Sequence, residues 1–103
     1  MIGLGKWKCT VNHAFYNGCA YITIKDNNGE YAFELDMPEF DKMPEYSVEE
    51  ITENGNRLEA VLKIKILPTK MTVVAEFDGD TMNAKIKIPF VGDIKIENAQ
   101  RVN

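Results

Sequence analysis

Two side chains in this sequence have the chemistry for acid–base work inside a folded core, His13 and Glu49. His13 is the only histidine of the chain, and an imidazole can act as a general base or hydrogen-bond a ligand near neutral pH. A carboxylate such as Glu49 that points into apolar surroundings holds its proton more tightly and can serve as an acid or a base. Both candidate catalytic roles depend on the elements that position these side chains.

Other kinds of chemistry leave no motif in the chain. One histidine and two cysteines on neighbouring predicted strands lack the number and spacing of ligands that a zinc site needs. The sequence contains no phosphate-binding loop, no glycine-rich dinucleotide fingerprint, no G-x-S-x-G and no Cys–His arrangement of recognisable spacing. We therefore expect neither a metal nor a cofactor.

Alternation of apolar and polar residues runs through most of the chain and predicts antiparallel β-strands. It is most regular from Asn54 to Glu97, where an Asn-Gly and an Asp-Gly pair each precede an alternating run. Such pairs signal hairpins, because both central positions of a type I′ turn need positive φ. The first predicted strand covers residues 4–13 and the last covers residues 93–102.

Turn positions predict the register of these strands. A turn at Asn17-Gly18 would pair Val11 with Ile24, and it would separate Cys9 from Cys19. Two cysteines are also too few for a secreted disulfide framework. We therefore expect both thiols to be reduced.

The later hairpins are predicted in the same way. A loop at residues 67–70 would pair Ile64 with Val73, and a turn at Asp78-Gly79 would pair Val73 with Ala84. These registers keep one apolar face continuous from strand to strand.

The fourth predicted strand, residues 45–52, changes parity, since Tyr46 and Val48 fall on one face and Ile51 on the other. A β-bulge near Glu49-Glu50 would reconcile the two parities. Without the bulge, Glu49 points inward.

Eight consecutive antiparallel strands with one apolar face predict a single all-β domain over residues 1–103. An open sheet would leave its first and last strands unpaired and one large apolar face wet, so the strands are expected to close into an up-and-down meander β-barrel. A two-sheet sandwich of the same strands is the alternative.

The two ends of this barrel differ in composition. One end carries short polar turns, whereas the links at the other end are apolar, aromatic and proline-containing. Exposed apolar surface at one end is typical of a ligand entrance or a partner interface, although the same side chains can fold over and plug a barrel of this width. The expected wall or gate of a pocket, with His13 as its polar handle, consists of Phe15, Tyr31, Phe33, Met37, Phe40, Met71 and Phe90.

Small side chains at Ala60, Ala75 and Ala84 fall toward the end that holds Trp7. We expect them to make room for the large indole ring. Any space for a ligand is then expected nearer the apolar mouth.

Gly5-Lys6-Trp7 on the first strand and Arg101 near the end of the last strand would meet at the polar-turn end. This pairing on an eight-stranded meander resembles the lipocalin-like barrels of the calycin superfamily. The resemblance implies that Trp7 plugs the closed end, that Arg101 packs across it, and that Gly5, Trp7 and Arg101 are structural residues. Being short and lacking an evident signal peptide, the chain is most similar to a small bacterial-type intracellular calycin-like barrel.

The composition of the chain limits the kinds of partner that it can bind. A formal net charge of −4 without a basic stripe argues against nucleic acid. No apolar run approaches the roughly 18 residues that span a bilayer, and no signal peptide is evident, so we expect a cytoplasmic protein that does not enter a membrane.

Three hypotheses of function follow. The first is binding of a small hydrophobic molecule inside the barrel or at its mouth, without catalysis. The second is an enzyme of the cyclase, isomerase or dehydratase type that uses His13 and Glu49 inside the barrel. The third is self-association, for example as a homodimer, of a barrel filled by its own side chains.

Overall fold

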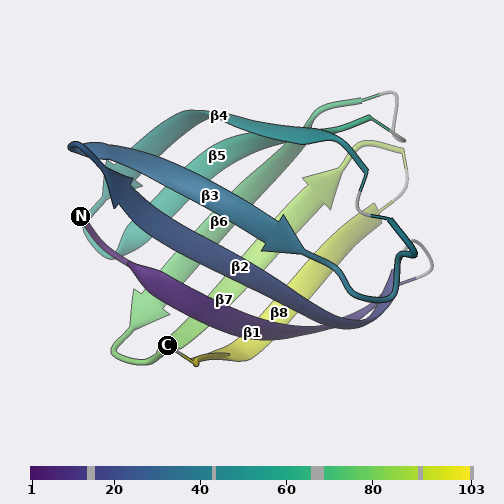
Figure 1. Cartoon of the computed structure of the whole chain (residues 1–103), viewed down its shortest axis with the longest axis horizontal. Coiled ribbons are helices and arrows are strands. Elements are labelled where there is room, and N and C mark those ends of the chain that lie inside the picture. Colours follow the sequence, from purple (N-terminus) through teal and green to yellow (C-terminus); the bar gives the residue numbers. More distant parts are fainter. Residues whose placement is uncertain (14–15, 43, 66–68, 91, 103) are drawn as a thin grey trace.

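The computed structural model describes residues 1–13, 16–42, 44–65, 69–90 and 92–102. Eight antiparallel strands follow one another (Figure 1) and form one sheet in the order β3-β2-β1-β8-β7-β6-β5-β4. Within the described part of the chain, no helix is long and apolar enough to cross a membrane. The strands are β1 (Gly5–Asn12), β2 (Asn17–Asn27), β3 (Glu30–Asp36), β4 (Tyr46–Asn54), β5 (Arg57–Ile64), β6 (Met71–Asp78), β7 (Thr81–Ile88) and β8 (Gly92–Arg101).

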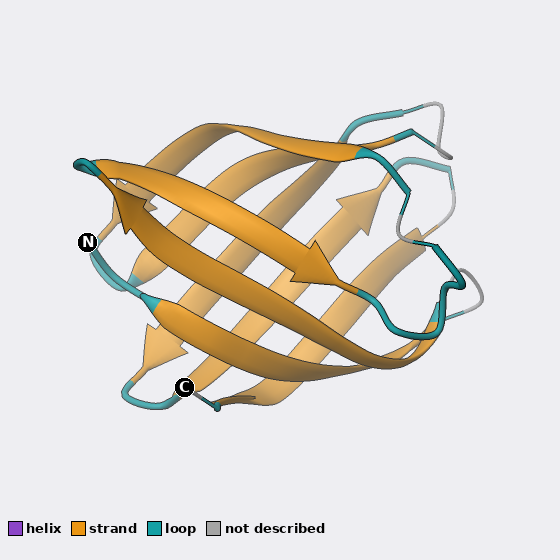
Figure 2. Cartoon of the chain, in the orientation of Figure 1, coloured by secondary structure: helices purple, strands orange, loops and turns teal. Residues whose placement is uncertain are grey.

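The sheet curls into a nearly closed barrel (Figure 2), which confirms the predicted eight-stranded meander. Pairing of β1 with β8, for example Trp7 opposite Arg101, joins the first strand to the last. Among the described residues, β3 and β4 share no ladder and form the two edges of the sheet. We call the boundary between them the β3–β4 seam.

The bulge predicted in β4 explains why the barrel opens there. The register of β4 against β5 shifts between Glu49 and Thr52, and Glu50 has a φ of +53°. A bulge bends and twists its strand, so β4 stays paired with β5 but forms no ladder with β3 in the described part of the chain. A second bulge, which the sequence pattern did not predict, lies in β8, where Asn98 has a φ of +55° and the register against β7 shifts.

The register predicted for the first hairpin is wrong. His13 and Tyr16 exchange backbone hydrogen bonds of 3.0 and 3.1 Å, so the chain reverses before Asn17-Gly18, and Cys9 pairs with Ala20. Burial of the Tyr16 side chain, 4 % exposed, stabilises this earlier reversal. The aromatic packing therefore outweighs the local turn preference of Asn-Gly.

The two cysteines are closer in the sheet than predicted and are nevertheless free. Cys19 pairs with Thr10, one position beside the pair of Cys9 and Ala20. Neighbouring residues of a strand point to opposite faces, so Cys9 lies in the core and Cys19 does not. Their separation is due to the alternation of faces rather than to distance along the strands.

Two later registers also differ from prediction. Val73 pairs with Ala60 rather than Ile64, because β5 ends at Ile64 and a longer loop follows; its residues 66–68 lie outside the described part of the chain. Val73 also pairs with Ile86 rather than Ala84, because the turn is centred one residue later than Asp78-Gly79. Each shift moves the partner by two or four residues and so preserves the inward face.

The core is the inward face of the barrel. Along the strands, buried and more exposed side chains broadly alternate. The residues with the least exposed surface include Trp7, Cys9, Met71 and Met82. Ile94 and Ile96 point inward between exposed Lys95 and Glu97, as predicted.

Candidate functional site

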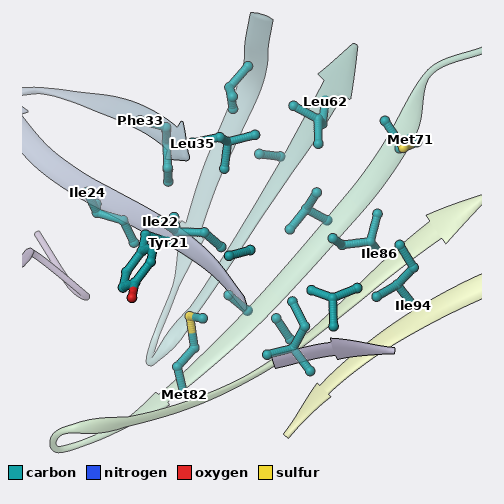
Figure 3. A pocket seen from close by; sticks show the side chains of 18 of the residues that line it. Tyr21, Ile22, Ile24, Phe33, Leu35, Leu62, Met71, Met82, Ile86 and Ile94 are labelled. Atoms are coloured by element: carbon teal, nitrogen blue, oxygen red, sulfur yellow. The ribbon is translucent and has the colours of Figure 1, made fainter. Parts of the chain in front are cut away.

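The interior of the barrel contains a cavity of about 100 Å³. All eight strands contribute to its lining, and Figure 3 shows Phe33, Met71 and Ile86 projecting toward the same space from different strands. The residues that line it are Val11, Ala20, Tyr21, Ile22, Ile24, Phe33, Leu35, Met37, Val48, Leu58, Ala60, Leu62, Ile64, Met71, Val73, Ala75, Met82, Ala84, Ile86, Ile94 and Ile96.

Small side chains create this cavity. The lining includes four alanines, Ala20, Ala60, Ala75 and Ala84, where a larger residue on the same inward face would fill the barrel. Three of them were expected to accommodate the indole, but Trp7 does not line the cavity. The space is thus in the body of the barrel, and the alternation pattern alone did not reveal it.

Partial exposure of inward-facing residues is consistent with this space. Ile22, Val73 and Ile86 face the interior from β2, β6 and β7, and yet each is only partly buried. Their neighbours on the same face, such as Ala75 and Ile24, are buried. All three residues line the cavity.

The cavity is chemically apolar. None of its described lining residues is Asp, Glu, Lys, Arg or His. They include one hydroxyl group, that of Tyr21, whose ring lies beneath the Lys6 ammonium at 4.9 Å. An ionised or strongly hydrogen-bonding group would lose its solvation inside without gaining a partner, so the interior accepts apolar groups.

The polar-turn end of the barrel is closed by the first residues of the chain. The Trp7 indole N–H donates to the Gly3 carbonyl at 2.8 Å, and the Arg101 guanidinium lies 4.6 Å from the Trp7 ring and donates to the Leu4 carbonyl. Phe77 packs against Trp7, with ring centroids 5.3 Å apart. Trp7 and Arg101 therefore meet as the sequence predicted.

At the opposite end, a turn after β3 folds over the β1–β2 hairpin. The Tyr16 hydroxyl donates to the Cys19 carbonyl at 2.6 Å and accepts from the Glu39 amide at 3.1 Å. Phe40 packs against Tyr16 with ring centroids 5.1 Å apart. Phe90 is fully exposed.

Two tyrosines connect β3 to β4 across the β3–β4 seam. The Leu35 amide donates to the Tyr46 hydroxyl at 2.8 Å. The Tyr31 hydroxyl donates to the Glu53 carboxylate and accepts from the Ile2 amide at 2.9 Å. Partial burial, and then the bond to Glu53, raise the pKa of Tyr31.

The structure brings only part of the predicted pocket wall together. Phe33, Met37 and Met71 line the cavity. Tyr31 instead stacks on Phe33 at 6.1 Å and belongs to the β3–β4 seam. Phe40 covers Tyr16 and Phe90 points away from the core, so neither lines the cavity, and Phe15 lies outside the described residues.

The two candidate catalytic residues are not assembled at the cavity. Glu49 lies on the outer surface, where its carboxylate forms ion pairs with Lys63 at 3.2 Å and Lys70 at 3.7 Å. His13 lies at the β1–β2 hairpin with Nε2 near Gly92 at the start of β8. Neither residue lines the cavity.

No group of three or more His, Cys, Asp or Glu residues that could hold a metal ion occurs in the described ranges.

The Cys9 thiol is buried in the core, and this burial raises the pKa of Cys9 to about 11. A thiol with such a pKa stays protonated near neutral pH and is a poor nucleophile.

A scan against protein-family models, a search of curated proteins and a search of solved structures each found no match to this chain. The nearly closed barrel of eight antiparallel strands is nevertheless consistent with the lipocalin-like architecture that Trp7 and Arg101 indicated. The case for a function therefore rests on the cavity and its surroundings.

Proposed function

We propose that the barrel binds one small apolar molecule, or the apolar part of a larger one, in its central cavity. The observation that supports this most directly is a cavity of about 100 Å³ lined by apolar side chains from every strand. Natural cores are packed with few voids larger than a water molecule. A void of this size destabilises the fold, and ligand binding would offset that cost.

The chemistry of the lining limits the ligand. An apolar cavity of about 150 Å³ stays dry and takes up benzene or xenon, so a cavity of about 100 Å³ suits a group of comparable or smaller size. Met37, Met71 and Met82 lie in the wall, and their unbranched side chains can adjust to different shapes. A polar group on the ligand would remain in water at the surface.

The closed end supports a further proposal, that the chain is a small calycin-like barrel. The indole of Trp7 and the guanidinium of Arg101 stack at 4.6 Å, and the resemblance implies this pairing. This arrangement is structural, and it leaves the interior free for a ligand.

Uptake of a small apolar probe tests the proposed function. Fluorobenzene titrated into the protein and observed by ¹⁹F NMR is expected to show saturable binding of one molecule per chain. In the Ala75→Leu variant three additional carbon atoms occupy much of the cavity, so binding is expected to be lost. Filling a cavity commonly stabilises a protein, by about 0.5–2 kcal/mol.

The matched control is Ala32→Leu, the same change on β3 at a residue that does not line the cavity. It is expected to leave fluorobenzene binding unchanged. Absence of saturable binding to the unmodified protein, or equal binding by the Ala75→Leu variant, would contradict the proposal. If fluorobenzene binds as expected, native mass spectrometry of protein purified from its own source is expected to show the natural ligand as an adduct.

A further inference from the structure

Most of the barrel wall is held by backbone ladders. Consecutive strands from β4 to β8, and from β1 to β3, are paired along most of their length, and β1 also pairs with β8. Opening the wall between two consecutive strands breaks several backbone hydrogen bonds at once. The pairs Trp7–Arg101 and Lys8–Gln100, together with the bond from the Val102 amide to the Lys6 carbonyl at 2.8 Å, join β1 to β8. The β3–β4 seam is different, because no ladder joins these strands in the described part of the chain.

Side-chain hydrogen bonds at two points replace the missing ladder. Toward the mouth, the Tyr46 hydroxyl accepts the Leu35 amide at 2.8 Å. Toward the closed end, the Tyr31 hydroxyl donates to the carboxylate of Glu53, an exposed residue. Each bond is formed by a tyrosine hydroxyl, so rotation of one side chain releases it without unfolding a strand.

The stretch between these two points borders the cavity. Phe33 and Leu35 from β3 and Val48 from β4 line it, and all three are only partly buried. At the β3–β4 seam the cavity is therefore separated from solvent by side chains rather than by a paired backbone.

In the described part of the chain, packed aromatic side chains lie at both ends of the barrel. At the closed end, Trp7, Phe77 and Arg101 pack beneath residues 2–4 of the chain. At the mouth, Tyr16 is 4 % exposed and its hydroxyl ties the 37–40 turn to β2. The described part of the mouth is therefore covered on this side by a packed aromatic.

We propose that the β3–β4 seam is the route by which the ligand enters and leaves, with Tyr46 and the Tyr31–Glu53 pair as its two latches. The proposal rests on the proposed function, since it presupposes a ligand in the cavity. It places the rate-limiting motion at one edge of the sheet, while the ladders of the remaining wall stay intact.

Exchange kinetics distinguish this route from the mouth. The dissociation rate constant of fluorobenzene is measured by ¹⁹F exchange NMR in the unmodified protein and in Tyr46→Phe, Glu53→Ala and Tyr16→Phe variants. Loss of one latch bond is expected to raise this rate constant about fivefold in the first two variants. Tyr16→Phe removes a hydroxyl at the mouth instead, and the rate constant is expected to stay within about twofold of the unmodified value.

The outcomes separate the two proposals. Faster exchange in the seam variants alone supports entry between β3 and β4. Acceleration by Tyr16→Phe alone, or no acceleration in any variant, overturns the route but leaves ligand binding intact. Absence of fluorobenzene binding in the unmodified protein overturns both. Glu53 is exposed, so its variant provides the test even if Tyr46→Phe fails to fold, and the fluorescence of Trp7 reports the fold in each case.

Discussion

Replacing Arg101 with methionine should destabilise the barrel by about 3 kcal/mol, mostly through one hydrogen bond. The guanidinium donates to the Leu4 carbonyl, and a hydrogen bond from a charged group contributes about 1.5–3 kcal/mol. Its position 4.6 Å from the Trp7 ring adds about 0.5–1 kcal/mol. Methionine retains a long apolar side chain over the ring, so the change removes the charge and the donors more than the packing.

The third interaction of this side chain contributes little. Arg101 Nε lies 2.9 Å from Asp80 Oδ1, but the Asp80 side chain is 83 % exposed. Exposed ion pairs contribute about 0–1 kcal/mol. Asp80→Asn is therefore the matched control, and its expected cost is about 0.5 kcal/mol or less.

Urea unfolding followed by tryptophan fluorescence measures these differences, because Trp7 is the only tryptophan and is fully buried. For a small domain with a slope of about 1–1.5 kcal/mol/M, the Arg101→Met variant is expected to unfold at a urea concentration about 2–3 M lower. The urea midpoint of Arg101→Lys should lie between those of the unmodified protein and Arg101→Met, since an ammonium keeps the charge but not the planar stack on Trp7.

Two results would refute this account of the closed end. One is a loss below about 0.5 kcal/mol in Arg101→Met, which would mean that the Leu4 bond contributes no more than a typical exposed ion pair. The other is an equal loss in Asp80→Asn and Arg101→Met, which would assign the stabilisation to the ion pair. A change in the slope of the unfolding curve would instead indicate altered compactness.

Two further predictions concern close packing and thiol reactivity. Gly3→Ala should destabilise the protein by about 1–3 kcal/mol more than Gly55→Ala in urea unfolding. Both glycines have positive φ, but a Cβ on Gly3 would stand 2.4 Å from the Phe77 ring, whereas one on Gly55 meets nothing within 4 Å. Equal losses of stability in the two variants would contradict this packing. Iodoacetamide at pH 8 should label Cys19 but not Cys9 in the folded protein, as read by mass spectrometry. Cys9 is fully buried and its pKa is raised to about 11, so only about 0.1 % of this thiol is thiolate at that pH. Labelling of both residues before unfolding would show that this part of the core opens.

Much of the fold could be predicted because strand alternation is a local signal. The inward positions of Ile94 and Ile96, the bulge at Glu49-Glu50 and the meeting of Trp7 with Arg101 all followed from residue types and parity. The site was predicted less well. Phe33, Met37 and Met71 line the cavity, whereas His13 and Glu49 do not.

The misplaced turns show where local signals fail. The Asn17-Gly18 pair lies inside β2, because burying Tyr16 stabilises an earlier reversal of the chain. Such competition depends on a contact with Phe40, 24 residues further along the chain, and alternation contains no information about it. Errors of two or four residues in pairing also leave the inward face unchanged, so the pattern cannot reveal them.

The sequence by itself determined that eight strands form, which side of every strand but the fourth faces the core, and which end carries the Trp7–Arg101 plug. These features depend on parity and side-chain type, and both can be read along the chain. Only the tertiary structure decided that Ala20, Ala60 and Ala75 leave a cavity and that the wall opens between β3 and β4. The size of the cavity depends on the distance between opposite walls of the barrel. The opening between β3 and β4 depends on whether two bent strands can form a ladder in one register.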